Sequence, residues 1–328
     1  MSEGTVVVLR VDSEALRGNS LGDPTTRNVH VYLPPGHDPK KPVPALLALA
    51  GFTGTGASMF NADPLGEDLR SRLDRLIGSG ECPPVVVAAP DCFTRVGGNQ
   101  YLNSQGTGRY EDFLLDEVLP AIEARHAVTA WGVFGKSSGG YGALTLGMRR
   151  PDRLQAVACH SGDSNFELCY APDVAPALDA FRAAGGPAAW LEKFWADHNR
   201  HRRQYHKALN VYAMARHYSP NAESPDGCDL PFDLETGEIR SDVWARWRAH
   251  DPVNLIERYA KNLEKLRLLY LDCGTRDEFG LQWGLRAMAQ KLRRFGVPAR
   301  VEEFDDGHMS ISYRQDTSLP ALAKALAR

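Results

Sequence analysis

The chain has 328 residues, 43% of them hydrophobic, enough to bury the core of one large α/β domain with an insertion or of two small domains. Its 38 basic and 41 acidic residues give a net charge of -3, which argues against a nucleic-acid-binding protein. No run of residues approaches the roughly 18 apolar positions that span a bilayer, and the first residues lack a secretion-signal pattern. We therefore expect a cytoplasmic protein without membrane or nucleic-acid partners.

The beginning of the chain predicts strands. Residues 5–11 and 28–33 are rich in β-branched side chains and have no helical pattern between them, so they predict an antiparallel pair. The apolar run 45–50 predicts a third strand, and a glycine-rich loop at 51–56 follows it. Leucines and an isoleucine then recur at helical spacing, which predicts an amphipathic helix containing Leu65, Leu69, Leu73, Leu76 and Ile77.

The same alternation continues to the end of the chain. Apolar or β-branched runs predict further strands, and apolar residues at helical spacing between them predict helices. This order of elements is typical of a mostly parallel sheet with helices on both faces, the plan of the α/β-hydrolase fold. The predicted strands are 84–89, 128–134, 155–160, 266–271 and 299–304, and the predicted helices include 113–122 and 281–295.

The segment 163–254 differs from its surroundings, because it is rich in aromatic and basic residues and lacks long β-branched runs. We interpret it as a mainly helical, cap-like insertion between two parts of the hydrolase core, 1–162 and 255–328. A small hairpin is predicted within residues 230–240. An insertion at this point would lie over the strand ends where α/β sheets bind ligands. Most of its tryptophans are expected only to pack the insertion onto the core.

Residues 135–139, Gly-Lys-Ser-Ser-Gly, stand between a predicted strand and a predicted helix, as in a nucleophile elbow. The elbow places its serine on a strained turn, and glycines two positions to either side leave room for the neighbouring backbone. Ser137 is therefore the candidate nucleophile. The motif is short, so the alternative is a turn without catalytic function.

An acid and a histidine follow Ser137 in the chain order of such hydrolases, each in a loop after a late predicted strand. His308 is the candidate base, and Asp277 is the preferred acid because it lies in a loop from which its carboxylate can reach across. Asp272, Glu278 and Asp163 are the rival acids. In the expected reaction Ser137 attacks an acyl carbonyl, and the histidine takes its proton.

The oxyanion formed in that attack needs two hydrogen-bond donors. We expect the backbone N–H groups of Ser138, at a helix start, and of Phe52, in the glycine-rich loop. Neither a P-loop nor a well-formed dinucleotide fingerprint is present in that loop. No cofactor is expected. Metal sites are not expected either, because no C-x-x-C pair occurs among the six cysteines, which we interpret as reduced thiols: Cys82, Cys92, Cys159, Cys169, Cys228 and Cys273.

These motifs together resemble the Putative esterase family of α/β-hydrolases, which includes S-formylglutathione hydrolase (esterase D), feruloyl and enterochelin esterases, and secreted mycolyltransferases. The resemblance covers nearly the whole core: residues 31–36, the loop at Gly51, residues 108–113 and 135–143, and the turns holding Asp277 and His308. It implies the same triad and oxyanion positions. Relatives often carry His-Gly where this chain has Ala50-Gly51, and His or Asp at the position of Lys136.

The expected function is hydrolysis of a small carboxylic ester through an acyl-serine. Acyl transfer or thioester hydrolysis on the same triad is the alternative within catalysis, and a non-catalytic binding module is the alternative outside it. Gly51, Asn103 and Tyr110 are candidate substrate-binding residues, although the loop 97–104 also fits a turn-rich connector. The basic stretch 198–207 fits either a site for anions or a solvated helix face. Assembly into a homo-oligomer is compatible with the sequence.

Overall fold

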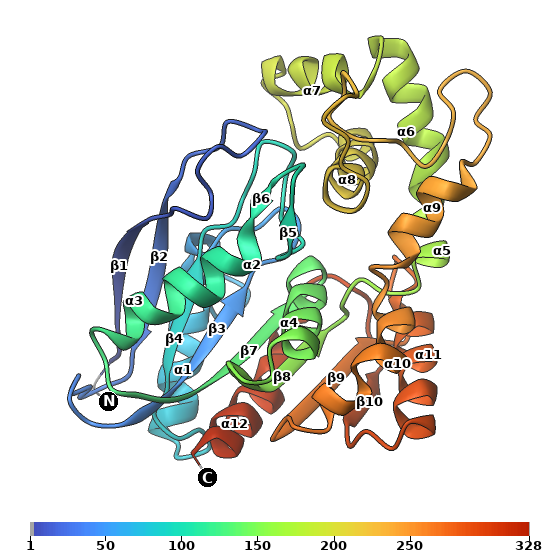
Figure 1. The fold of residues 1–328 in the computed structure, drawn as a ribbon. Coiled ribbons are helices and arrows are strands. Elements are labelled where there is room, and N and C mark those ends of the chain that lie inside the picture. The colour runs from blue at the N-terminus through green and yellow to red at the C-terminus, as the bar shows by residue number, and fades with distance from the viewer. Residues whose placement is uncertain (1–2, 328) are drawn as a thin grey trace.

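The computed structural model describes residues 3–327, the side chains at positions 203 and 204 excepted. Within these residues the main sheet has eight strands in the order β1-β2-β4-β3-β7-β8-β9-β10 (Figure 1). The pairs β1–β2 and β2–β4 are antiparallel, and the other neighbours are parallel. The strands are β1 (Thr5–Asp12), β2 (Thr26–Leu33), β3 (Val43–Leu49), β4 (Val86–Pro90), β7 (Val128–Lys136), β8 (Leu154–His160), β9 (Leu268–Gly274) and β10 (Arg300–Phe304).

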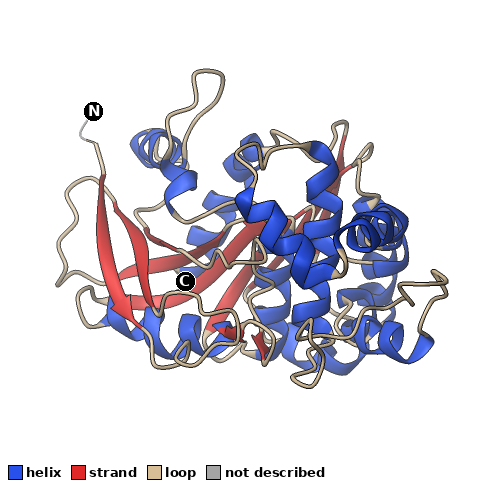
Figure 2. Ribbon diagram, turned by 90° about the horizontal axis from the view of Figure 1, so that it is seen from above, coloured by secondary structure: helices blue, strands red, loops and turns tan. Residues whose placement is uncertain are grey.

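The helices of the core cover both faces of this sheet (Figure 2). On one face, α1 (Leu69–Gly78) and α12 (Gln315–Leu326) pack against side chains such as Leu46 and Phe134. The other face is covered by α2 (Tyr110–Asp112), α3 (Leu119–Glu123), α4 (Ser138–Arg149), α10 (Pro252–Leu263) and α11 (Leu281–Arg294). The arrangement confirms the predicted α/β-hydrolase fold class.

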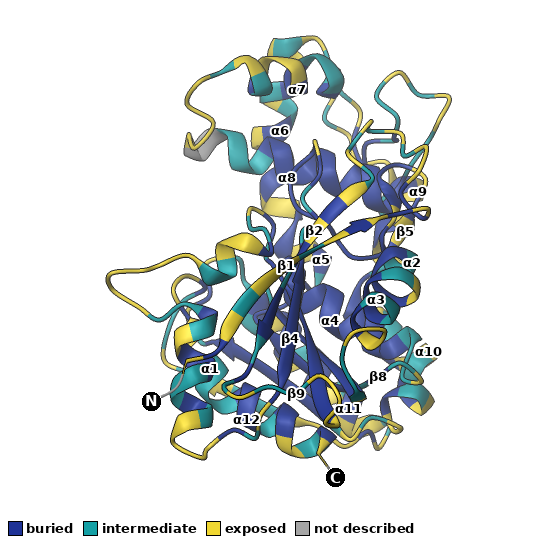
Figure 3. Cartoon of the chain, turned by 90° about the vertical axis from the view of Figure 1, so that its left-hand side faces the viewer, coloured by how far each residue is buried: buried dark blue, intermediate teal, exposed yellow. Residues whose placement is uncertain are grey.

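Burial follows position in the sheet (Figure 3). The central strands β3 and β4 are buried at every residue, because helices cover both of their faces. Strand β1, at the sheet edge, is largely exposed, and its Val8 is 54% exposed. Shorter elements complete the core: β5 (Asn103–Ser104), β6 (Gly108–Arg109), and 3-10 turns at Ala57–Phe60 and Ser312–Arg314.

Two predicted helices differ in detail from the observed ones. Helix α1 begins only at Leu69, because the Asp68 carboxylate caps it by accepting from the N–H groups of Arg70 and Ser71. Leu65 therefore lies outside the helix and is 97% exposed. The helix predicted over 113–122 contains a π-helical stretch, Phe113–Val118, just before Pro120, which lacks an N–H donor.

The segment between β8 and α10 is mainly helical and extends beyond one end of the sheet (Figure 1). Its base is an aromatic cluster in which Phe166 stacks on Tyr218, and Tyr218 packs edge-on against the buried Trp247. The predicted hairpin is reduced to one antiparallel bridge between Phe232 and Ile239. The helices are α5 (Phe166–Cys169), α6 (Ala171–Ala184), α7 (Pro187–Ala196), α8 (Arg203–Tyr218) and α9 (Ser241–Arg248). The division of the chain into three parts stays a prediction.

Candidate active site

Ser137 lies on the sharp turn between β7 and α4, with φ 58° and ψ -128°. A side chain at such a positive φ costs conformational energy, so the turn depends on the packing around it. The flanking glycines permit that packing: a Cβ on Gly135 would overlap the carbonyl of Gly139, and one on Gly139 would overlap the carbonyl of Leu49. The geometry is that of the nucleophile elbow expected from the sequence.

Two backbone N–H groups lie beside this serine. Ser138 is the first residue of α4, where N–H groups have no partner within the helix. The loop after β3 passes close by, since a Cβ added to Gly51 would lie 3.7 Å from the Cβ of Ser137. Within residues 3–327, neither the N–H of Phe52 nor that of Ser138 has a protein acceptor. Both are free to bind an oxyanion.

The loops that follow β9 and β10 bring Asp277 and His308 together. His308 Nδ1 lies 2.8 Å from Asp277 Oδ2, and both residues are buried. The histidine is held further by its backbone N–H, which donates to Glu278 Oε2 at 2.6 Å, and by the ring of Phe279, whose centroid lies 4.7 Å away. Of the four acids considered from the sequence, Asp277 is thus the one that binds the histidine ring.

The environment keeps Asp277 charged. Burial raises the pKa of its carboxyl, but the hydrogen bond and the positive charge of His308 lower the pKa more, so it lies below its usual value. Lys136, in the elbow, has its pKa lowered by burial, while Asp277, Glu278 and Asp163 act to raise it. Three carboxylates, those of Asp277, Glu278 and Asp163, therefore lie close enough to act on the charge of Lys136.

The hydroxyl of Ser137 does not point at the histidine in this structure. It donates to Asp163 Oδ1 at 3.4 Å, and the hydrogen-bonded pairs of the described residues do not include Ser137 with His308. A serine hydroxyl is free to rotate, and catalytic hydrogen bonds often form only when substrate binds. The structure therefore contains the serine and the histidine–aspartate pair, but not the hydrogen bond between Ser137 and His308 that a triad would have.

The rival acid Asp272 belongs to a separate buried network. His160 Nδ1 lies 2.7 Å from Asp272 Oδ1, and His160 Nε2 lies 2.9 Å from Ser318 Oγ. This arrangement imitates a catalytic triad, but its serine is 0% exposed, so no substrate can reach it. Its link to the active site is structural: the carbonyl of His160 accepts a hydrogen bond from the N–H of Ser137 at 3.0 Å.

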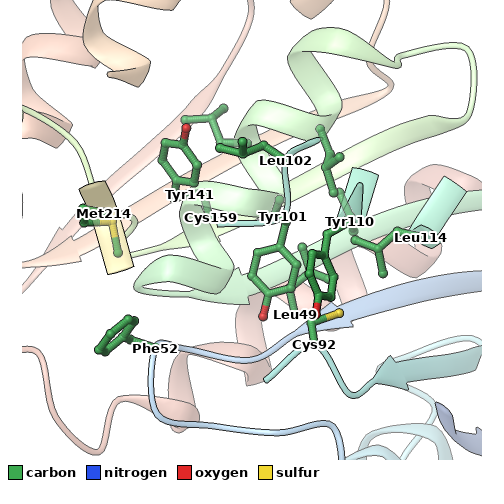
Figure 4. Packing of buried hydrophobic residues seen from close by; sticks show 14 of the residues in the cluster. Leu49, Phe52, Cys92, Tyr101, Leu102, Tyr110, Leu114, Tyr141, Cys159 and Met214 are labelled. Atoms are coloured by element: carbon green, nitrogen blue, oxygen red, sulfur yellow. The ribbon is translucent and has the colours of Figure 1, made fainter. Parts of the chain in front are cut away.

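Two candidate substrate-binding residues have other partners. Tyr110 is 1% exposed, its hydroxyl accepts from Arg27 Nη2 at 2.7 Å, and Figure 4 shows it among Leu49, Cys92 and Tyr101. Asn103 is exposed, and its amide donates to Asp112 Oδ1 at 2.7 Å. These contacts belong to the core and to the surface, so a substrate-binding role for either residue stays an untested prediction.

The insertion supplies a residue that the sequence did not single out. Helix α8 places the ring of His206 edge-on to Phe52, at 5.7 Å between centroids, and 6.1 Å from the ring of Phe279. Burial lowers the pKa of His206, and the charges of Asp173 and Asp163 act in the opposite direction. The sequence placed His206 in the basic stretch 198–207, which fits either a site for anions or a solvated helix face. Its buried neighbour Leu209, one turn later, was the available signal.

The described residues hold no group of three or more side chains placed to bind a metal ion. None of their helices combines the length and the apolar character needed to cross a bilayer.

A family model described as "Putative esterase" matches residues 19–316 of the chain. Three solved structures show similar folds. A ferulic acid esterase is 21% identical with a TM-score of 0.62, over 99% of this chain and 100% of that one. S-formylglutathione hydrolase from Agrobacterium tumefaciens is 20% identical with a TM-score of 0.60, over 99% and 97%. A fluorophosphonate-binding serine hydrolase of Staphylococcus aureus is 15% identical with a TM-score of 0.60, over 99% of each chain.

Proposed function

The chain belongs to the Putative esterase family, and on that premise we propose that it hydrolyses carboxylic esters through an acyl-enzyme formed on Ser137. Family membership makes the chain a serine esterase, and the roles of individual residues are our proposal. One observation carries the proposal. His308 and Asp277, in the loops after β10 and β9, form a buried pair 2.8 Å apart, and the turn after β7 of the same sheet holds Ser137 at positive φ.

In the proposed reaction the Ser137 hydroxyl turns from Asp163 to His308 Nε2. Asp277 accepts a hydrogen bond from Nδ1–H, which leaves Nε2 unprotonated and able to take the serine proton as Oγ attacks the acyl carbon. The C–O bond of the ester then breaks, and the histidine returns the proton to the leaving alcohol. Water attacks the acyl-serine in the second half of the reaction, with the same histidine as base.

The tetrahedral intermediates carry a negative oxygen, which the N–H groups of Phe52 and Ser138 would bind. Such donors, fixed before the reaction, stabilise charge that develops only in the transition state. The Ser138 N–H lies at the N-terminus of α4, where the helix dipole adds to the attraction. The free N–H groups and the nearness of Gly51 to the serine support this assignment.

The test is covalent labelling with a fluorophosphonate probe, read by mass spectrometry of the peptide that contains residue 137. We expect an adduct on Ser137 and none in the Ser137→Ala variant. Ser318→Ala is the matched control, because Ser318 also hydrogen-bonds a histidine–aspartate pair but is buried, so that variant should label like the native chain. A folded native chain without an adduct would contradict the proposal and favour a binding module.

A cytoplasmic location is part of the proposal. All six cysteines are free and buried in the structure, as expected of a protein kept in a reducing compartment. The substrate is proposed to be a small ester, and the chemistry of its two halves is left to assay.

A further inference from the structure

His206, on helix α8 of the insertion, packs against two loops of the proposed active site. Helix α8 belongs to the segment that extends beyond one end of the sheet (Figure 1). The ring of His206 lies edge-on to Phe52, whose N–H is a proposed oxyanion donor, at 5.7 Å between centroids. It also lies 6.1 Å from the ring of Phe279, which in turn lies 4.7 Å from the ring of His308. One side chain of the insertion thus joins the loop of the oxyanion donor to the loop that covers the histidine.

The order of the strands places this ring across the nucleophile. Phe52 follows β3 and Phe279 follows β9, and the strands from one to the other are β3-β7-β8-β9. Ser137 stands at the end of β7, the neighbour of β3. Adjacent strands are about 4.8 Å apart, and three such spacings separate the two loops. A ring that packs on both Phe52 and Phe279 therefore lies across the ends of β7 and β8, on the side of Ser137 that faces the insertion.

The ring nitrogens of His206 differ from those of other histidines in this region. His160, His217 and His308 each have a ring nitrogen within hydrogen-bond distance of a neighbouring side chain. Among the residues that the structure describes, none is hydrogen-bonded to the ring of His206, and the two aromatic rings beside it offer no nitrogen or oxygen atom. The side chain is partly buried. A polar group in such surroundings gains from a ligand that supplies the missing partner.

The ionisation of this imidazole favours an uncharged partner. Burial lowers the pKa of His206, although the charges of Asp173 and Asp163 act against it, so the ring is neutral at pH 7. A neutral imidazole has one nitrogen that donates a hydrogen bond and one that accepts. It lacks the positive charge that strengthens hydrogen bonds to anions. An uncharged oxygen, such as that of an ether or a hydroxyl group, therefore suits the ring better than a carboxylate or a phosphate.

We propose that His206 is a substrate-binding residue, which hydrogen-bonds an uncharged oxygen on the chain of a small ester, close to the scissile carbonyl. This role rests on the proposed function. There the carbonyl oxygen is bound by the N–H groups of Phe52 and Ser138, and the leaving oxygen receives its proton from His308, so His206 serves a further oxygen. The preferred substrates are esters that carry an ether or hydroxyl group on the acyl or the alcohol chain. The insertion thereby selects the substrate, and the core carries out the reaction.

Pairs of esters in which an ether oxygen replaces a methylene group measure this contact. On the acyl side the pair is p-nitrophenyl methoxyacetate and p-nitrophenyl butyrate. On the alcohol side it is methoxyethyl acetate and butyl acetate. For each pair, kcat/KM of the ether ester is divided by kcat/KM of the hydrocarbon ester. The intrinsic reactivities of the esters cancel when this ratio is compared between native and variant chains, and the two pairs distinguish an oxygen on the acyl chain from one on the alcohol chain.

His206→Phe keeps an aromatic ring between Phe52 and Phe279 and removes both nitrogens. We expect it to lower the ratio about fivefold in at least one pair, the effect of losing one neutral hydrogen bond. His206→Gln retains a donor and an acceptor, so it should keep more of the ratio than His206→Phe. The matched control is His201→Phe, the same replacement at an exposed position of the same basic stretch, which should leave both ratios unchanged.

Unchanged ratios for both pairs in folded His206→Phe would overturn the inference. If that variant does not fold, the ring nitrogens of His206 are followed by NMR in Ser137→Ala, which is expected to bind esters without cleaving them. Their shifts should move more with methoxyethyl acetate or methyl methoxyacetate than with butyl acetate or methyl butyrate. Equal shifts within both of these pairs would also contradict the role of His206. Failure of Ser137 to label would instead count against the proposed function.

Discussion

Ser137 and Ser318 show how little the residue types alone say about catalysis. The chain holds two histidine–aspartate pairs, His308 with Asp277 and His160 with Asp272, and only the second has a serine, Ser318, hydrogen-bonded to it in this structure. Ser318 and Ser137 differ in their surroundings, not in residue type. Ser318 is 0% exposed within the core, whereas Ser137 stands at positive φ on a turn with free N–H groups beside it.

The two aspartates should therefore respond differently to the same substitution. We expect Asp277→Asn to lower kcat for p-nitrophenyl acetate by about 10⁴, because the asparagine amide stabilises the wrong tautomer of the histidine. Asp272→Asn, measured in the same assay, should retain kcat within a few-fold, since its network only supports the elbow through the His160 carbonyl. Equal losses in the two folded variants would place the catalytic acid elsewhere.

At this scale the sequence could predict the sharp turn at Ser137 and the approach of Asp277 to His308, because chain order and the position of each residue after a predicted strand carry that information. It could not show that Asp163, one of the rival acids, is the hydrogen-bond partner of the Ser137 hydroxyl in this structure. Asp163 and Ser137 are 26 positions apart, and their hydrogen bond depends on how the loop after β8 packs on the elbow. His206 contacts the site only because α8 returns to it.

Among the elements, the loop from Thr94 to Ser104 supports the loop that carries Phe52. Gly98 packs against the backbone of Phe52 so closely that a Cβ there would overlap its carbonyl. Tyr101 belongs to the same loop as Gly98, and its hydroxyl donates a hydrogen bond to the carbonyl of Ala50 at 2.5 Å. The loop 97–104, which the sequence also allowed to be a turn-rich connector, is mostly buried and contacts the backbone of Phe52 and Ala50.

Gly98→Ala should therefore displace Phe52 and weaken the oxyanion site. We expect kcat for p-nitrophenyl acetate to fall by about 10²-fold, the usual cost of losing one oxyanion donor. The matched control is Gly106→Ala, whose Cβ would overlap the backbone of Arg216 instead. Both variants should lose about 1–3 kcal/mol in the free energy of urea unfolding. If kcat falls equally in both, the loss reflects general instability and not Phe52.

Element types were predictable where periodicity is strong. The central parallel strand β3 is a continuous apolar run, and α11 repeats apolar residues on one face, so both could be identified from the sequence. The helices of the insertion were harder to predict one by one from the sequence. Their aromatic residues pack against one another and not against the sheet, and Phe166 on Tyr218 is an example. The late start of α1 depends on a local cap, Asp68, whose hydrogen bonds compete with an apolar repeat that would extend to Leu65.

For the molecule as a whole, two histidines of the insertion, the buried His217 and the partly buried His250, make stability depend on pH. His217 is held by Thr107 Oγ1 at 3.1 Å, and His250 stacks on Tyr218. Burial lowers the pKa of His217 to about 3 and that of His250 to about 4. Both rings are therefore neutral in the folded chain at pH 5, whereas the unfolded chain, with an ordinary pKa near 6.5, takes up protons.

The sign follows from proton uptake. Below about pH 6.5 the unfolded state binds more protons than the folded state. The free energy of unfolding therefore decreases as the pH is lowered, by up to about 1.4 kcal/mol per pH unit for each histidine. This loss continues until the folded pKa values are reached. Urea unfolding at pH 7.5 and pH 5.0 should show it in the native chain. His217→Gln should show a smaller drop between the same two pH values. An equal drop would mean that His217 is not the group that takes up protons on unfolding.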